Sequence, residues 1–209
     1  MNIAISHALL LSLLKKQLDN SFILTDNEEK CIERCLSETL IKTELCFSNT
    51  PNKYYTKNNE TYFSPYHSGQ YSIFLYFLSR TVFEENSENN ILADKIYYLN
   101  KIMNSVDIYY EVKMPEIFML DHPLGSVMGR AKYGNFFTFS QQCTIGNNKG
   151  VFPVIGEHVT MYSGSKIIGK CSIGNHVTIA ANTYIKDTNI PDNSIVFGSS
   201  PNLTIKTKK

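Results

Sequence analysis

The sequence predicts two parts, an all-helical N-terminal region and a parallel β-helix that follows it. Three observations support this. Apolar residues recur at helical spacing in the first half of the chain, and from Ile155 to Ile185 an aliphatic residue recurs every six positions. Small residues and turn formers that tolerate left-handed backbone stand between these aliphatic residues. A period of six fits neither a helix nor a hairpin, but three hexads make one triangular coil whose aliphatic row is buried by the next coil.

The period is strict in one stretch and interrupted elsewhere. Its aliphatic positions are Ile155, Met161, Ile167, Ile173, Ile179 and Ile185, and its small positions are Val159, Ser165, Cys171, Val177 and Thr183. Further back, the same phase takes in Ile145, Phe139, Tyr133 and Val127, and then, after a slip of one residue, Leu120, Met114 and Ile108. The step from Ile145 to Ile155 is ten, so four extra residues are expected to leave the coil as a loop at residues 147–151.

Three domains are expected: a helical region at residues 1–105, the β-helix at 106–190, and a tail at 191–209 that packs back on the β-helix. Helical spacing covers residues 3–18, 26–47, 66–83 and 93–103. Thr25 and Glu28 are spaced as a capping box at the start of the second helix. The polar segment 50–65 is predicted to be a loop, and residues 86–90 are predicted to break the helical pattern.

Composition excludes several classes of protein. The chain has 20 basic and 19 acidic side chains without a dense basic block, so no nucleic-acid partner is expected. The five cysteines form no CxxC pair, which indicates reduced thiols in a cytoplasmic protein and no metal site. Residues 1–20 lack a basic region before their apolar core, so an amphipathic helix is favoured over a signal peptide. No apolar run reaches the roughly 18 residues of a membrane span, so no membrane insertion is expected.

Candidate chemistry concentrates between residues 105 and 129, where Asp107 and His122 lie fifteen residues apart. Acyl transfer to an alcohol needs a base, and neutral imidazole is suited to that role near pH 7. A carboxylate on the other ring nitrogen would fix the tautomer. Fifteen residues is a little under one coil of eighteen, so Asp107 and His122 can reach the same edge of the triangular β-helix from adjacent coils. The alternative is a histidine satisfied in a turn and an aspartate that caps one.

These residues lie in strings that resemble serine O-acetyltransferases and the wider hexapeptide-repeat acyltransferases. The strings are Leu120-Asp121-His122 with Gly125, the strand from Gln142 to Gly146, and the turn from Gly198 to Pro201. The resemblance implies a left-handed β-helix, with His122 as catalytic base, Asp107 as the carboxylate that orients it, and Asp121 as an acceptor contact. It also implies acetyl-CoA as co-substrate, no metal, and a homotrimer, with a hexamer as the alternative. The positions matching the family's coenzyme A contacts are Asn147, Ser163, Thr178 and Ala181.

One departure from the serine acetyltransferases bears on the acceptor. Their Arg-His pair, which grips serine ahead of a proline, falls here on Val151 and Phe152 before Pro153. A guanidinium that forks onto a carboxylate is not replaced by valine. The predicted acceptor is therefore a hydroxyl of a sugar or surface-polysaccharide precursor, with Phe152 as an apolar wall and Lys149 restoring some of the lost charge.

Several alternatives stay open at this stage. Two alternatives are enzymes, a serine O-acetyltransferase of cysteine biosynthesis and an N-acetyltransferase that acts on an amino sugar. A third is a non-catalytic β-helix that serves as a scaffold protein. Tyr66, His67 and Gln70 are alternative acceptor contacts, although core or surface roles are favoured. His158 and His176, eighteen residues apart, are expected to stack on one corner as exposed turn residues, because neither has the further histidine that a zinc site would need.

Overall fold

The computed structural model describes residues 1–85 and 90–208. The chain divides into two compact units, Met1–Asn104 and Ser105–Lys209. The predicted fold class, a helical region followed by a parallel β-helix, is confirmed. Of the break predicted at 86–90, residues 86–89 lie outside the described part of the chain.

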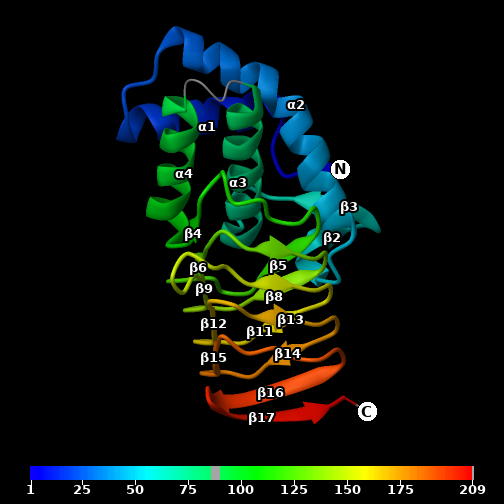
Figure 1. Cartoon of the computed structure of the whole chain (residues 1–209). Coiled ribbons are helices and arrows are strands. Elements are labelled where there is room, and N and C mark those ends of the chain that lie inside the picture. Colours follow the sequence, from blue (N-terminus) through cyan, green and yellow to red (C-terminus); the bar gives the residue numbers. More distant parts are fainter. Residues whose placement is uncertain (86–89, 209) are drawn as a thin grey trace. The chain divides into compact units, whose positions relative to one another are not determined.

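The described residues of the first unit form four α-helices, α1 (His7–Ser21), α2 (Asp26–Ser48), α3 (Ser68–Glu85) and α4 (Ile91–Asn104). Helix α3 packs against both α2 and α4, and Figure 1 shows it beside α4. Its buried residues lie on nearly every side of the helix, as expected of a helix that is apolar all round. Within residues 1–85 and 90–208, no helix has both the length and the apolar character to cross a bilayer.

Side-chain caps fix where the first two helices begin. Ser6 accepts a hydrogen bond from the Leu9 amide and starts α1, so the helix begins four residues later than the sequence suggested. Thr25 and Glu28 form the predicted capping box, in which each side chain accepts from the backbone amide of the other residue. Such caps satisfy amides that have no partner within the helix.

A three-stranded sheet accompanies the helices, and the prediction of a loop at 50–65 is wrong. Its strands are β1 (Asn2–Ile3), β2 (Thr56–Lys57) and β3 (Glu60–Phe63), with β3 in the centre. Gln70 of α3 is fully buried and donates to the carbonyls of Tyr54 and Tyr62 at 2.8 and 3.3 Å. It therefore has the structural role that the sequence favoured over acceptor binding.

The second unit is the β-helix, in which each coil places short parallel strands on three faces (Figure 1). The first face carries β4 (Asp107–Ile108), β6 (Val127–Met128), β9 (Thr144–Gly146), β12 (Lys166–Ile168) and β15 (Tyr184–Lys186). The second carries β7 (Lys132–Tyr133), β10 (Val154–Ile155) and β13 (Ser172–Ile173). The third carries β5 (Phe118–Leu120), β8 (Phe137–Phe139), β11 (Thr160–Met161) and β14 (Thr178–Ile179).

Strand register tests the predicted phase. Ile167 pairs with Ile185, eighteen residues on, whereas Ile145 pairs with Ile167, twenty-two residues on. The four extra residues confirm the predicted loop. All six aliphatic positions from Ile155 to Ile185 are buried, and each such side chain contributes about 1.5–3 kcal/mol relative to exposure.

The predicted phase fails at one strand. Met128 pairs with Ile145 and is 2% exposed, while Val127 is 41% exposed. Met128, not Val127, therefore points into the core. A slip of one residue exchanges the two faces of a strand. The step from Leu120 to Met128 is eight residues and the step from Met128 to Tyr133 is five, so the period is broken on both sides of this strand and not only before it.

The last coil ends in a hairpin. Strand β16 (Ser194–Ser199) pairs in parallel with β14 and β15, and the chain then reverses at Ser200-Pro201. Strand β17 (Asn202–Thr207) pairs antiparallel with β16 along its whole length. This hairpin covers the open edges of two faces of the prism, where unpaired amides would otherwise remain.

Candidate active site

His122 lies in the turn that carries the chain from the third face to the first, between β5 and β6. Its backbone is in the left-handed region, with φ 49°, and its side chain is 84% exposed. The Leu124 amide donates to the His122 carbonyl at 2.8 Å, which closes the turn. The imidazole therefore projects from the corner and is not part of the core.

Asp107 stands on the coil next to this turn. Its amide donates to the Ser126 carbonyl at 2.9 Å, and the Gly125 amide donates to the Ser105 carbonyl at 2.7 Å. Asp107 is the residue opposite Val127 in the pairing of β4 with β6. The residues that follow His122 thus run directly beside Asp107, and the side chain of Asp107 is half-buried.

Asp121 precedes the histidine and is also exposed. Its carboxylate oxygen Oδ1 lies 3.9 Å from His122 Nε2, and its side chain is 60% exposed. The Asp121 amide donates to the Phe139 carbonyl at 3.0 Å, which ties this residue to the third face. A carboxylate at that distance can attract a charged imidazole but is beyond hydrogen-bonding range.

The predicted acceptor loop lies at a different corner, between the first and second faces. Asn148 and Val151 exchange two backbone hydrogen bonds of 3.0 Å. Lys149 and Gly150, the two residues between them, have φ 50° and 79°. Two consecutive residues at positive φ are typical of a type I′ hairpin turn. Lys149 is exposed at the tip and Phe152 is half-buried at the base.

The neighbouring coils hold this hairpin in place. Asn148 Nδ2 donates to Asp187 Oδ2 at 2.6 Å, and the Lys170 amide donates to Asp187 Oδ1 at 2.8 Å. The Lys170 amide and Asn148 together lower the pKa of Asp187 below its usual value. Gly169 lies beside this carboxylate with φ 83°, where a Cβ would stand 2.6 Å from Asn148 Cβ. The site therefore needs a glycine.

The predicted coenzyme A contacts are divided between the two corners. The Gln142 amide donates to the Leu124 carbonyl, the Gly164 amide to Gln141, and the Asn182 amide to Ser163. These hydrogen bonds join successive coils at the corner that carries His122. Ser163 lies on this corner one coil beyond Gln142, and Ala181 lies two coils beyond it. Thr178 lies on β14, the strand that leads into this corner. Asn147 follows β9 and belongs to the hairpin corner.

Sequence reasoning did not single out Arg130, which lies on the hairpin corner one coil before Asn147. Its Nη2 lies 2.6 Å from Glu111 Oε2, and its guanidinium stands over the Tyr109 ring at 5.7 Å. The neighbouring Gly129 amide donates to the Ile145 carbonyl, which fixes the position of Arg130 in the stack. No repeat or motif marks this arginine, because its partner Glu111 is nineteen residues away in the sequence.

His158 and His176 stack as predicted, with ring centroids 4.6 Å apart and planes inclined by 8°. Phe136 extends the stack at 4.3 Å from His158. All three have φ between 54° and 63°, so they are turn residues of the corner between the second and third faces. Both histidines are exposed, and their column lies on neither of the corners described above.

Comparison with known proteins identifies the repeat. The family "Bacterial transferase hexapeptide (six repeats)" matches residues 152–187. Residues 152–187 of the β-helix therefore carry hexapeptide repeats. Over 137 residues the chain is 24% identical to a serine acetyltransferase of Staphylococcus aureus (strain Mu50 / ATCC 700699). The match covers 63% of this chain and 63% of the relative, so the chain is aligned to less than two thirds of that protein.

Solved structures agree with the fold. The chain resembles a serine acetyltransferase in complex with CoA, with TM-score 0.64 and 20% identity over 85% of this chain and 75% of that chain. The Neisseria gonorrhoeae serine acetyltransferase in complex with serine gives a TM-score of 0.66 and 20% identity, over 84% of this chain and 74% of that chain. At these identities the likeness concerns the fold alone.

Proposed function

We propose that the chain is an acetyl-CoA-dependent O-acetyltransferase of the serine acetyltransferase type. The observation that carries the proposal is the placement of His122 on an exposed turn whose following residues run beside Asp107. The hexapeptide repeats and the likeness to serine acetyltransferases support it, including one relative of known structure that binds CoA.

In the proposed reaction His122 accepts the proton of the acceptor hydroxyl as that oxygen attacks the thioester carbonyl carbon. Asp107 orients the imidazole and stabilises the imidazolium that forms. The carbon–sulfur bond then breaks, and the proton passes from His122 to the departing thiolate. The products are an acetyl ester and free coenzyme A. Asp121, whose carboxylate lies 3.9 Å from the imidazole, is the proposed contact to the acceptor.

Serine is the acceptor that the comparisons favour, since the similar proteins are serine acetyltransferases and one of them was solved with serine. The chain lacks the Arg-His pair of that family, but Arg130 supplies a guanidinium on the same corner as the hairpin. We propose Arg130 and Lys149 as the cations that would meet the carboxylate of serine.

A sugar hydroxyl is the second candidate, favoured by one observation. Val151 and Phe152 stand where serine acetyltransferases carry the pair, and an exposed valine beside an aromatic ring suits an uncharged acceptor. A half-buried phenylalanine offers a face on which a sugar ring can pack.

The division of the predicted residues between two corners favours a site shared by two copies. His122, Ser163 and Ala181 lie at one end of the first-face strands, and Asn147, Lys149 and Phe152 follow the other end. A homotrimer, or a hexamer made of two trimers, would bring one corner of each copy against the other corner of its neighbour. Cyclic symmetry closes such head-to-tail contacts.

The test is a thiol-release assay with acetyl-CoA and a panel of L-serine, free sugars, nucleotide sugars and oligosaccharides. Turnover with L-serine that falls in Arg130→Gln supports the first candidate. Turnover with a sugar, with a product that hydroxylamine cleaves, supports the second. If no acceptor is acetylated and coenzyme A does not bind, the enzyme proposal is wrong and the scaffold alternative is favoured.

A further inference from the structure

Two cysteines of α2 and one glutamate of α3 form a thiol–carboxylate cluster in the first unit. Cys31 Sγ lies 2.9 Å from Glu85 Oε2, and Cys35 Sγ lies 3.1 Å from the same oxygen. The three ligand atoms are within 4.8 Å of one another. Cys35 is 4% exposed and Cys31 is half-buried. The cluster is therefore assembled by the packing of α3 on α2.

We propose that Cys31, Cys35 and Glu85 bind a thiophilic divalent cation such as Zn²⁺. Two thiolates and one carboxylate are a donor set that suits zinc, which takes sulfur and oxygen ligands in tetrahedral geometry. Cysteines four residues apart on a helix lie on the same face, so both sulfurs reach the ion from one side. Glu85 approaches from the facing helix.

Charge supports this assignment. Two thiolates and a carboxylate carry three negative charges, and a divalent ion with the Arg34 guanidinium carries three positive charges. Arg34 Nε donates to Glu85 Oε1 at 2.8 Å, so it holds the carboxylate by the oxygen that is not bonded to the two sulfurs. A group that orients a metal ligand in this way strengthens the site. The occupied cluster would be neutral, which lowers the cost of burying it.

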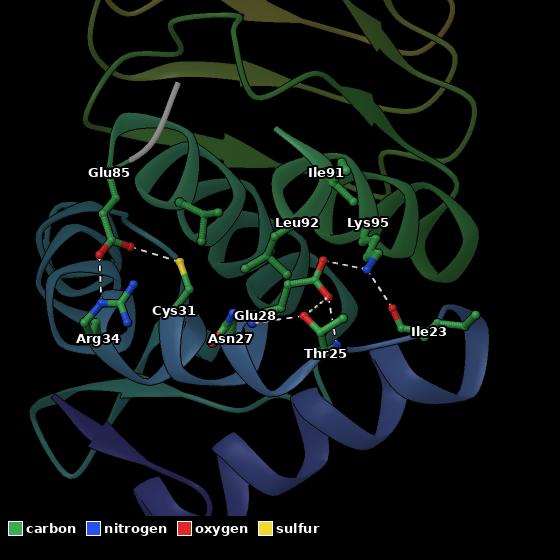
Figure 2. A pocket seen from close by; sticks show the side chains of 11 residues that line it. Ile23, Thr25, Asn27, Glu28, Cys31, Arg34, Glu85, Ile91, Leu92 and Lys95 are labelled. Carbon is green, nitrogen blue, oxygen red and sulfur yellow. Dashed lines mark hydrogen bonds and ion pairs between the residues drawn. The ribbon is translucent and has the colours of Figure 1, made fainter. Parts of the chain in front are cut away.

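Access and coordination number are consistent with an ion that keeps one open position. Cys31, Arg34 and Glu85 line a cavity of about 720 Å³, whose wall also includes Glu28, Lys95 and Ile23. Figure 2 shows the Cys31 sulfur and the Glu85 carboxylate turned toward each other at one end of this cavity. A water molecule would complete a tetrahedron with the three protein ligands.

Both thiols donate hydrogen bonds to the same oxygen of Glu85. Burial and the Glu85 carboxylate raise the pKa of Cys31 to about 11. Hydrogen bonds from Cys31, Arg34 and Cys35 lower the pKa of Glu85 to about 2. A bound cation would take the place of the two thiol protons that now lie against the Glu85 carboxylate.

The experiment is titration of the reduced full chain with Co²⁺ and then with Zn²⁺. The expected result is one equivalent of Co²⁺ with a thiolate-to-cobalt charge-transfer band, which Zn²⁺ removes. Cys31→Ser with Cys35→Ser should abolish the band, and Cys171→Ser, a buried cysteine outside the cluster, should leave it unchanged. Glu85→Gln keeps the side-chain shape but removes a charged ligand. It should weaken metal binding by at least the roughly 10–100-fold that is typical when a residue that only hydrogen-bonds to a ligand is replaced.

Circular dichroism spectra of each variant establish that it is folded. The proposal is wrong if the folded wild type binds no more Co²⁺ or Zn²⁺ than the double serine variant. It is also wrong if the band persists in that variant. Disulfide formation between Cys31 and Cys35 on mild oxidation, without any metal uptake by the reduced protein, would identify a redox pair in place of a metal site.

Discussion

Replacing Gly169 by alanine should destabilise the β-helix more than the same change at Gly150. Both glycines have similar backbone angles, with φ 83° and 79°. The left-handed conformation costs alanine about 1–2 kcal/mol at either position. Only at Gly169 would the new Cβ meet neighbours, with Asn148 Cβ at 2.6 Å and the Asp187 carboxylate closer still, whereas at Gly150 nothing lies within 4 Å.

Relieving that contact should cost about 1–3 kcal/mol more, the usual range for overpacking. Gly169→Ala is therefore expected to lose about 2–5 kcal/mol and Gly150→Ala about 1–2 kcal/mol. The measurement is the free energy of unfolding in urea, followed by circular dichroism. Because Asn148 would be pushed from Asp187, the KM for the acceptor should also rise in Gly169→Ala. Equal stability of the two variants would show that the hairpin is not held as described.

Three further predictions concern the core, the thiol–carboxylate cluster and the acceptor. Ile167→Ala should lower the free energy of unfolding by about 2–5 kcal/mol, since this side chain is fully buried. The matched change Ile205→Ala should lower it far less, because Ile205 is 41% exposed. Unfolding in urea measures both values. The stability that ionised Glu85 supplies should be complete above about pH 4.5 and be lost as the pH falls toward 2. The melting temperatures of the wild type and Glu85→Gln should therefore converge near pH 2. A difference in melting temperature that stays constant with pH would contradict the lowered pKa. Val151→Arg combined with Phe152→His should lower the KM for L-serine if these positions set the acceptor, and an unchanged KM would remove them from that role.

The β-helix was predictable because its signal is repeated. Each aliphatic residue from Ile155 to Ile185 is reinforced by an equivalent residue eighteen positions away, and the pairing of Ile167 with Ile185 follows from that. The exchange of Val127 and Met128 was not predictable. Both are apolar, and a register slip of one residue at an interrupted coil leaves no compositional trace.

The sheet of the first unit and the thiol–carboxylate cluster were missed for a related reason. Strands of two to four residues carry too little alternation to be recognised, and Gln70 fixes them through bonds to residues 8 and 16 positions earlier. Glu85 reaches Cys31 across 54 positions. Such contacts depend on how helices pack, which no local pattern in the sequence encodes.

His122 was singled out from the sequence pattern Leu120-Asp121-His122 with Gly125. The sequence did not reveal that His122 lies on an exposed turn, or that the strand after this turn pairs with the strand of Asp107. The two-corner arrangement could not be seen in a linear pattern, because Asn147 and Ser163 differ only in which strand they follow. The same holds for Arg130, whose neighbours Glu111 and Tyr109 belong to the preceding coil.

The most direct test of the proposed function compares thiol release from acetyl-CoA by the wild type and His122→Ala, with the best acceptor of the panel. Loss of a positioned general base should lower kcat by about 10² or more. Stability should be unchanged, because the side chain is 84% exposed. A folded His122→Ala variant with the same kcat as the wild type would contradict the account.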